Sequence, residues 1–131
     1  MLRALRNLLR RKPEPLGPFG EKLALRALRR AGYVILARNA RVGRYEVDVI
    51  ARERDTTAFI EVKTRQNQKE IAPEENVGFD KRKHLRQAAR LYIAGENNPS
   101  MYYRFDVVSV LVPENAKPST TIYRDAFRDR E

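Results

Sequence analysis

The stretch from Arg44 to Arg65, RYEVDVIARERDTTAFIEVKTR, constrains the fold more than any other part of this sequence. It contains two β-type runs, Arg44–Ala51 and Ala58–Thr64, joined by a polar link at Arg52–Thr57. Both runs alternate between apolar and polar residues, which is typical of strands that cover a core with one face. Because the link is short, the two runs are expected to pair as an antiparallel hairpin.

The same two runs place acidic residues where a buried strand normally has aliphatic ones. Alternate residues of a strand point to the same face, so Glu46 should lie beside Asp48, and Glu61 beside Lys63. The opposite faces are then apolar, and they comprise Tyr45, Val47, Val49, Ile60 and Val62. If the register brings the polar faces together, three carboxylates and one ammonium group share roughly 10 Å of sheet surface.

Two interpretations of this polar face remain open. Like charges at such a spacing are costly unless a cation joins them, and Mg²⁺ (or Mn²⁺) binds carboxylate oxygens together with substrate phosphates. In that case Lys63 would position or deprotonate a water and stabilise negative charge on phosphorus. Alternatively, the face is exposed to solvent, and Glu61 and Lys63 form an ordinary charge pair.

The remaining periodicity predicts one α/β domain with a mixed sheet, in the order α-β-β-β-α-β-β. Two helices are expected, one ended by Gly32 and the other capped by Asp80. The predicted elements are helix Phe19–Ala31, strand Tyr33–Arg38, turn Asn39–Gly43, the hairpin, loop Gln66–Phe79, helix Lys81–Ala94, strand Arg104–Val112 and edge strand Thr121–Phe127, which runs into a short helical turn.

The chain of 131 residues has a net charge of +10 and a pI near 10.3, a balance that favours polyanionic partners. Residues 1–12 contain five cations and no acid, and their leucines recur at helical spacing. Three prolines and Gly17 in Pro13–Pro18 indicate a linker. We therefore divide the chain into a basic extension and linker, 1–17, and one domain, 18–131. The extension is either a frayed end or a contact for nucleic acid, membrane or a partner.

Other residue counts narrow the chemistry. The absence of cysteine excludes disulfides, thiolate catalysis and cysteine-zinc sites. With His84 as the single histidine, a Ser-His-Asp triad or a multi-histidine metal site is not expected. No run of about 18 apolar residues occurs, so no transmembrane helix is predicted. The absence of cysteine is compatible with a reducing cytoplasm, where we expect the protein to be located.

Asp48, followed by twelve residues and then Glu61-Val62-Lys63, resembles the D…(D/E)xK signature of the restriction-endonuclease-like superfamily. The segments FGEKLALRALRRAGYVILARNAR, EVDVIA, FIEVKTR, DKRKHLRQAARLYI, RFDVV and DAF occur in the order and spacing of the YraN-type family. This bacterial family is similar to archaeal Holliday-junction resolvases. The resemblance covers roughly Pro18 to Phe127 and implies a restriction-endonuclease-like, three-layer α/β core.

The resemblance also implies roles for individual residues. Asp48 and Glu61 look like metal-binding acids, and Lys63 looks like the catalytic lysine. Glu21 resembles an additional acid beside the metal, and Glu46 matches the acid two residues before the aspartate. The position before that acid is usually glycine, but here it is Tyr45, which puts close approach of DNA backbone at this point in doubt.

These observations predict a Mg²⁺-dependent DNA endonuclease, with branched or junction DNA among its expected substrates. The expected nucleic-acid contacts are Arg65, Lys81, Lys83 and Arg86. Resolvase-like chemistry needs two active sites, so a homodimer is also expected. Two alternatives remain: a non-catalytic nucleic-acid-binding protein with the same fold, and an interaction protein that docks through its basic extension.

Overall fold

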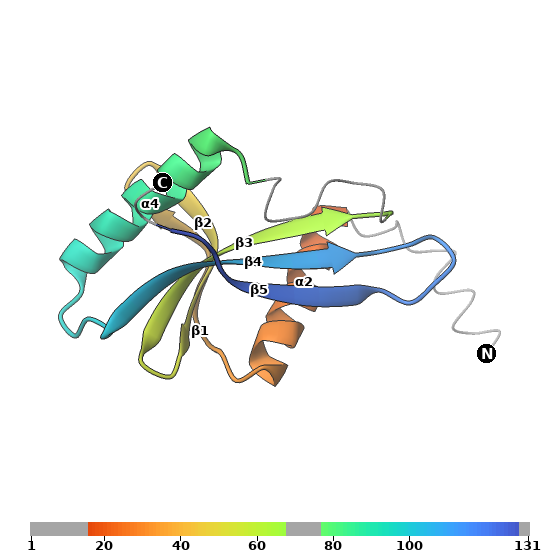
Figure 1. Ribbon diagram of the computed structural model, residues 1–131, viewed down its shortest axis with the longest axis horizontal. Coiled ribbons are helices and arrows are strands. Elements are labelled where there is room, and N and C mark those ends of the chain that lie inside the picture. Colours follow the sequence, from red (N-terminus) through yellow and green to blue (C-terminus); the bar gives the residue numbers. More distant parts are fainter. Residues whose placement is uncertain (1–15, 68–76, 129–131) are drawn as a thin grey trace.

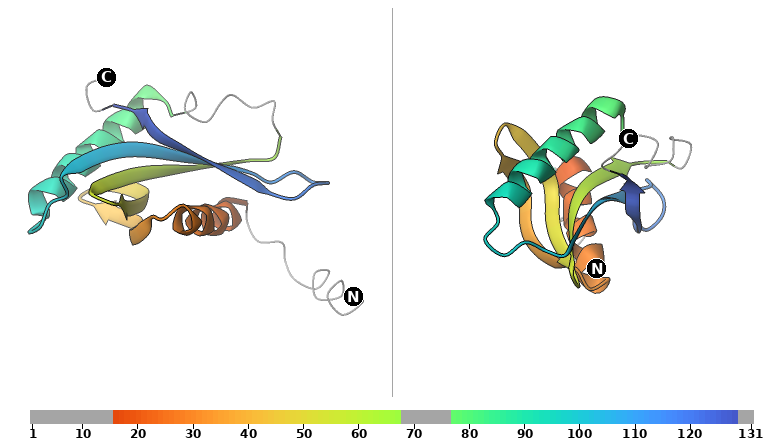
Figure 2. Two further views of the ribbon diagram at one scale, coloured as in Figure 1. Left: turned by 60° about the horizontal axis from the view of Figure 1, so that its bottom comes forward. Right: turned by 60° about the vertical axis from the view of Figure 1, so that its left-hand side comes forward.

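The computed structural model describes residues 16–67 and 77–128 (Figure 1). Five strands form one mixed sheet in the order β1-β2-β3-β4-β5, with α2 against one face and α4 against the other (Figure 2). This arrangement confirms the predicted element order. The elements are α2 (Leu16–Arg30), β1 (Val34–Val42), β2 (Tyr45–Glu53), β3 (Thr56–Arg65), α4 (Phe79–Gly95), β4 (Tyr102–Leu111) and β5 (Ser119–Phe127).

Strand pairing follows the chain except at one step. β1, β2 and β3 form two antiparallel hairpins, as the alternation and short links predicted. β3 then pairs with β4 in parallel, and the connection between them contains α4. A parallel pair requires such a crossover, whereas β4 and β5 pair antiparallel through a turn.

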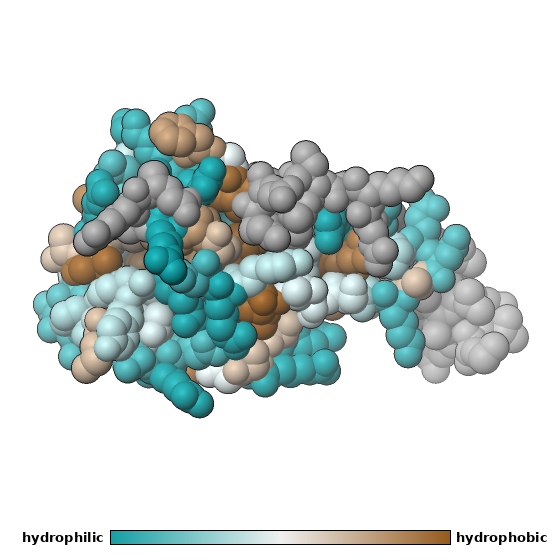
Figure 3. Space-filling model, in the orientation of Figure 1, coloured by the Kyte–Doolittle hydropathy of each residue, from teal (hydrophilic) through white to brown (hydrophobic). Residues whose placement is uncertain are grey.

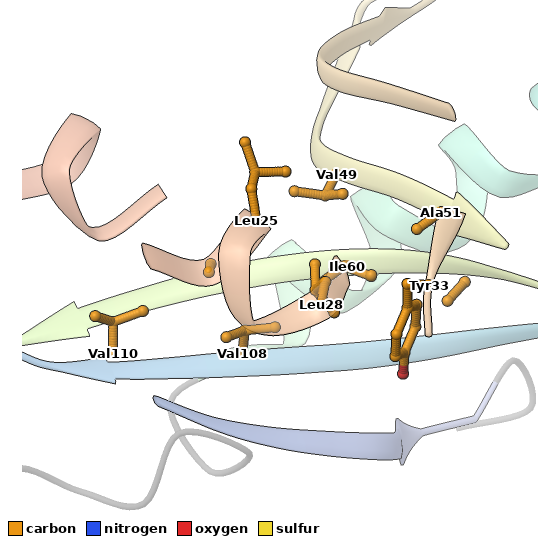
Figure 4. Close-up of a cluster of buried hydrophobic side chains, with 10 residues drawn as sticks. Leu25, Leu28, Tyr33, Val49, Ala51, Ile60, Val108 and Val110 are labelled. Atoms are coloured by element: carbon orange, nitrogen blue, oxygen red, sulfur yellow. The ribbon is translucent and has the colours of Figure 1, made fainter. Parts of the chain in front are cut away.

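Two hydrophobic clusters hold the three layers together. In the first, Leu25 and Leu28 of α2 pack on sheet residues that include Ile60, Val108 and Val110 (Figure 4). The second lies under α4, and its fully buried members include Val47, Ile50, Phe59, Leu85, Ala88 and Val107. Consecutive β3 residues therefore enter opposite clusters, which explains why the middle of this strand is apolar on both faces.

A buried polar network ties the α2 face together near the link between β2 and β3. Asp106 is fully buried in β4, and its carboxylate accepts hydrogen bonds from Tyr33 Oη (2.7 Å), Arg104 Nε (2.8 Å) and the backbone N–H of Asp125 (2.9 Å). Arg104 also donates to Glu53 Oε1 at 2.7 Å, and Arg124 binds both oxygens of Glu53. We call the side chains of Tyr33, Glu53, Arg104, Asp106 and Arg124 the RFD network, after the sequence RFD of residues 104–106.

The structure corrects several predicted boundaries. α2 begins at Leu16, so Gly17 and Pro18 lie in its first turn and not in a linker. Proline is tolerated there because the first backbone N–H groups of a helix have no intrahelical acceptor, so none is lost. The expected turn at Asn39–Gly43 is wrong, because β1 continues to Val42 and the chain reverses at Gly43 and Arg44. α4 begins at Phe79 after the N-cap residue Gly78, so Asp80 lies in the first turn and does not cap the helix.

One face assignment in the hairpin was also wrong. Val47 packs in the cluster under α4, but Val49 packs in the cluster under α2. Asp48 and Asn39 lie between the pairs Arg38–Val49 and Ala40–Val47 and are not themselves paired. Asn39 has a positive φ of 47°, which interrupts the regular extended backbone of β1. The sheet is irregular at this point, so strict alternation does not carry through Asp48.

Neither helix in residues 16–67 and 77–128 has the length and apolar character needed to span a membrane. The predicted basic amphipathic helix lies in residues 1–12, outside the described residues, as does most of the predicted loop at 68–76.

Candidate functional site

The site lies where pairing between β2 and β3 stops. The last pair of the ladder is Val49 with Ile60, and the two strands continue past it without further pairs. Asp48 is the first β2 residue beyond the ladder, and its Oδ2 accepts a hydrogen bond from the backbone N–H of Val62 at 2.8 Å. A side chain thus replaces a backbone acceptor, which holds the Asp48 carboxylate between the two strands.

Glu61 is the buried acid of the site. It follows the last ladder residue of β3, is 5% exposed, and lies between two ammonium groups. Lys63 Nζ is 3.6 Å from its Oε1, and Lys81 Nζ is 3.4 Å from its Oε2. The latter is an ion-pair distance without hydrogen-bond geometry, and Oε2 is a buried oxygen with no hydrogen-bond partner in the described chain.

The electrostatics of Glu61 reflect this placement. Burial raises the pKa of its carboxyl above the ordinary 4.5, and the nearby charge of Asp48 raises it further. Lys81 and Lys63 oppose both effects, because positive charge favours the ionised form. The carboxylate is therefore held at an electrostatic cost, which an added cation would reduce.

Lys63 and Lys81 reach Glu61 from different elements. Lys63 lies two residues along β3, on the same face as Glu61, as the alternation predicted. Lys81 extends from the first turn of α4. Their side chains are 34% and 37% exposed, so each ammonium group is accessible to solvent while it contacts a buried carboxylate.

Glu21 and Glu46 lie at the periphery of this group. Glu21, on α2, accepts a hydrogen bond from Asn39 Nδ2 at 3.3 Å, and Asn39 is the β1 neighbour of Asp48. Glu46 is 73% exposed and lies 3.9 Å from Arg41. The carboxylates of Glu21 and Glu46 thus have partners at the surface. By contrast, Asp48 is hydrogen-bonded to the β3 backbone, and Glu61 is a buried residue of β3.

Gly20 allows α2 to approach the site. A Cβ atom at this position would lie 2.8 Å from Cγ2 and 2.9 Å from Cβ of Thr64, which is closer than real atoms pack. Glycine is therefore required for α2 to contact β3 here. The contact places Glu21, the next residue, on the side of the sheet where the ladder opens.

The four predicted nucleic-acid contacts occupy different environments. Lys83 is exposed on α4, and Lys81 is engaged with Glu61. Arg65 is half-buried at the end of β3. Arg86 is only 7% exposed, and its Nη1 has no hydrogen-bond partner in the described chain. A phosphate on the outer face of α4 would meet Lys83 but not Arg86.

A groove of about 540 Å³ opens beside Lys81, between α4 and the turn that joins β1 to β2. Its positive residues are Arg41, Arg44 and Lys81, and Glu46 is its one acid. Tyr45 and His84 form the aromatic part, with ring centroids 5.6 Å apart, and Arg44 lies over the Tyr45 ring. Tyr45, which stands where glycine was expected, thus fills part of this groove.

The donor set suits a hard divalent cation only in part. Mg²⁺ needs one or two protein carboxylates and completes its shell with water and phosphate oxygens, a requirement that Asp48 and Glu61 can meet. The buried Glu61 Oε2 without a hydrogen-bond partner is consistent with this use. Among residues 16–67 and 77–128, however, no three acidic or histidine side chains are arranged to hold an ion.

Three features of the site were not foreseen. The ion pair from Lys81 to Glu61 joins α4 to β3, although Lys81 was expected to contact phosphate. Asn39 was taken for a turn residue, and Gly20 was not considered. A glycine inside a strongly amphipathic helix is a sequence signal for close packing, so Gly20 could have been found.

Comparison with known proteins places the chain among bacterial sequences. Residues 20–110 match the Uncharacterised protein family UPF0102. A UPF0102 protein of Nocardia farcinica is 48% identical over 105 residues, covering 80% of this chain and 83% of its own. One of Caldicellulosiruptor bescii is 41% identical (85% and 95% covered), and one of Clostridium botulinum is 36% identical (86% and 94%).

Proposed function

The chain belongs to the Uncharacterised protein family UPF0102, and from its candidate site we propose that it is a divalent-cation-dependent endonuclease that hydrolyses phosphodiester bonds of DNA. One observation carries the proposal: Glu61 is a buried carboxylate beside Asp48 and between two ammonium groups, and within the described residues its Oε2 has the ion-pair contact with Lys81 but no hydrogen bond of regular geometry. A purely structural acid would normally be hydrogen-bonded when buried. We expect the protein to act in the cytoplasm, on DNA that includes branched or junction forms, and as a homodimer.

Asp48 and Glu61 would hold Mg²⁺ or Mn²⁺ directly, with Glu21 and Glu46 as acids in its surroundings. When bound, the cation would supply charge stabilisation and a more acidic water. The hydrogen bond from Val62 N–H would keep Asp48 oriented toward β3. The low exposure of Glu61 would limit competing water around its carboxylate.

Lys63 would act at the reacting phosphate. Its Nζ is partly exposed and can donate hydrogen bonds to the attacking water or to a non-bridging phosphate oxygen, where negative charge grows during hydrolysis. The ion pair between Lys81 and Glu61 would weaken when a cation binds, because the cation and the Lys81 ammonium group compete for Glu61 Oε2. Lys81 could then contact substrate phosphate, the role expected from the sequence.

One observation favours a second candidate, a nucleic-acid-binding protein without catalysis. The described residues contain no ready-made group of three metal ligands, and Lys81 occupies the position beside Glu61 Oε2. A lysine that neutralises an acid can preserve the fold where a metal is not used. The net charge of +10 would still support binding to phosphate backbones.

Cleavage assays separate the two candidates. Supercoiled plasmid and a synthetic four-way junction are incubated with the protein in Mg²⁺, Mn²⁺ or EDTA. We expect metal-dependent nicking that falls at least about 100-fold in Asp48→Asn, Glu61→Gln and Lys63→Met, the usual cost of removing a transition-state contact. Glu46→Gln, a peripheral carboxylate, is the matched control and should lose much less. DNA binding without cleavage under any metal would support the second candidate instead.

A further inference from the structure

The outer side of α2 carries a stripe of positive charge that the proposed site does not use. Lys22, Arg26, Arg29 and Arg30 follow one another at spacings of four, three and one residues, which places them along one side of the helix. All four are exposed, and the stripe extends over about 12 Å of the helix axis, at 1.5 Å per residue. Figure 2 shows α2 on the opposite face of the sheet from α4, and the exposure of these four side chains places the stripe on the solvent side of the helix.

A groove runs along each flank of the stripe. Between α2 and β5 it encloses about 690 Å³, with Arg26, Arg30 and the hydroxyls of Ser119, Thr120 and Thr121 in its lining. Between α2 and β1 it encloses about 330 Å³, and Arg38 of β1 faces the helix there. No acidic residue of the described chain lines either groove.

Most of this charge has no ion-pair partner among the described residues. In the described part of the chain, Arg26, Arg29, Arg30 and Arg38 form no ion pair. Like charges four residues apart destabilise a helix, so the pair Arg26 and Arg30 has a cost that no ion pair of the described chain offsets. The nearby Arg124 differs, because it is bound to both oxygens of Glu53.

The groove beside Lys81 is also lined by positive residues, but its net positive charge is lower. It contains an acid, Glu46, and its lysine is engaged with Glu61. The surface around α2 is thus the more uniformly positive of the two, although the sequence had suggested that α4 would contact phosphates. We define the α2 ridge as Lys22, Arg26, Arg29, Arg30 and Arg38.

We propose that the α2 ridge binds the phosphate backbone of a nucleic acid, on the opposite side of the sheet from Glu61 and α4. The arginines supply charge, and the hydroxyls of Ser119–Thr121 supply neutral donors of the kind that contact phosphates. This inference rests on the nucleic-acid partner of the proposed function but not on cleavage. A backbone held on the ridge would be a second contact surface, separate from the segment at the site.

The salt dependence of binding tests this inference. Fluorescence anisotropy with a labelled linear duplex is measured in EDTA over a KCl series, so that cleavage cannot contribute. The triple variant R26Q/R29Q/R30Q should lower the slope of log affinity against log salt by about 2.7, and affinity near 0.1 M salt by about 100-fold. R26K/R29K/R30K keeps the charge and should retain most of the slope.

A second triple variant controls for net charge. R52Q/R54Q/R128Q removes the same charge from exposed positions outside the ridge and should change the slope far less. Equal losses in both triple variants would overturn the inference, because binding would then depend on total charge alone. No loss in R26Q/R29Q/R30Q, or no duplex binding by the unmodified protein, would also overturn it.

Two further measurements distinguish nucleic-acid binding by the α2 ridge from membrane binding and from the proposed catalysis. If R26Q/R29Q/R30Q loses binding to vesicles rich in phosphatidylserine but keeps its affinity for duplex, the ridge is a membrane contact and the inference fails. The cleavage assay described under the proposed function is the second measurement, because it reads catalysis separately from duplex binding in EDTA. A ridge-dependent slope together with absent cleavage would leave this inference standing and remove only the proposed catalysis.

Discussion

A carboxylate is buried on each face of the sheet near the middle of β3, Asp106 on the α2 face and Glu61 on the α4 face, and the two differ in how completely they are hydrogen-bonded. In the RFD network the Asp106 carboxylate accepts hydrogen bonds from Tyr33, Arg104 and a backbone N–H, and Glu53 joins two arginines. On the α4 face, Glu61 has two ammonium neighbours at 3.4 and 3.6 Å, and one of its oxygens has no hydrogen-bond partner among the described residues.

This difference is consistent with a structural role for the RFD network and with the functional role proposed for Glu61 and its neighbours. A fully satisfied network in a low-dielectric interior stabilises one arrangement of the chain. An incompletely satisfied acid beside another acid is costly, and such costs are commonly found where a ligand or substrate completes the set. Hydrophilic residues cover much of the coloured part of the face seen in Figure 3, so charge at the surface is common, and it is burial that makes Asp106 and Glu61 unusual.

The largest effect should come from removing the centre of the RFD network. Asp106→Ala leaves Arg104 partly buried without its main partner and Tyr33 without an acceptor, so we expect unfolding to become easier by about 3–5 kcal/mol. Urea denaturation measures this change. Asp55→Ala, at an exposed turn position, is the control and should cost under about 0.5 kcal/mol. A small loss at Asp106 would mean that the network is not structural.

Glu53 should show a smaller loss with a defined pH dependence. Its hydrogen bond from Arg124 is the main cause that lowers the pKa of its carboxyl from 4.5 to about 2, against the opposing effect of burial. Because the folded value is the lower one, this stabilisation is complete above pH 4.5 and disappears as the pH falls toward 2. Glu53→Gln should therefore lose up to about 3 kcal/mol at pH 7 and little at pH 2. A loss that did not depend on pH would contradict an ionic origin.

Gly20→Ala tests how closely α2 must approach β3 at the site. The added methyl group overlaps Thr64, and overpacking of this kind costs about 1–3 kcal/mol. Thermal unfolding measures the cost, and the double variant Gly20→Ala/Thr64→Ala should recover part of it because most of the opposing side chain is removed. Gly17→Ala is the matched control, since nothing lies within 4 Å of its added atom. Equal effects at Gly17 and Gly20 would exclude the contact as the cause.

The smallest change in stability is expected for Glu61→Gln, and it is the most informative because this variant should stabilise the protein while the others destabilise it. Burial and Asp48 raise the pKa of Glu61, so the ionised carboxylate opposes folding once the pH exceeds 4.5. We expect Glu61→Gln to stabilise the protein by roughly 0.5–1 kcal/mol at neutral pH, a typical gain when a functional strain is removed. The gain should vanish below pH 4.5, where both side chains are neutral. A loss at neutral pH would place Glu61 with the structural charges.

The sequence was sufficient for much of the fold. Alternation in Arg44–Arg65 predicted the hairpin, and helical periodicity predicted both described helices, because these patterns reflect the same core that the structure buries. It was insufficient where local and tertiary preferences compete. Asparagine is common in turns, yet Asn39 lies within β1, where it has a positive φ. Pairing of β1 with β2 outweighs this local preference.

The candidate site was foreseen in its centre and not at its edges. The two-residue spacing of Glu61 and Lys63 was enough to place them on one face. Side-chain hydrogen bonds across the molecule, such as that from Asn39 to Glu21, depend on how α2 packs and have no local pattern. The exposed position of Glu46 was missed for a related reason, because strict alternation fails at Asp48.

The hydrogen bond from Tyr33 to Asp106 also gives the molecule an optical property. Burial, reinforced by the adjacent carboxylate, raises the pKa of this phenol above its ordinary value of 10. In the folded chain its ionisation is therefore displaced to more alkaline pH than that of an exposed tyrosine. The near-ultraviolet absorbance of the Tyr33 phenolate would then appear together with loss of the RFD network, so the protein contains its own spectroscopic reporter of that end of the sheet.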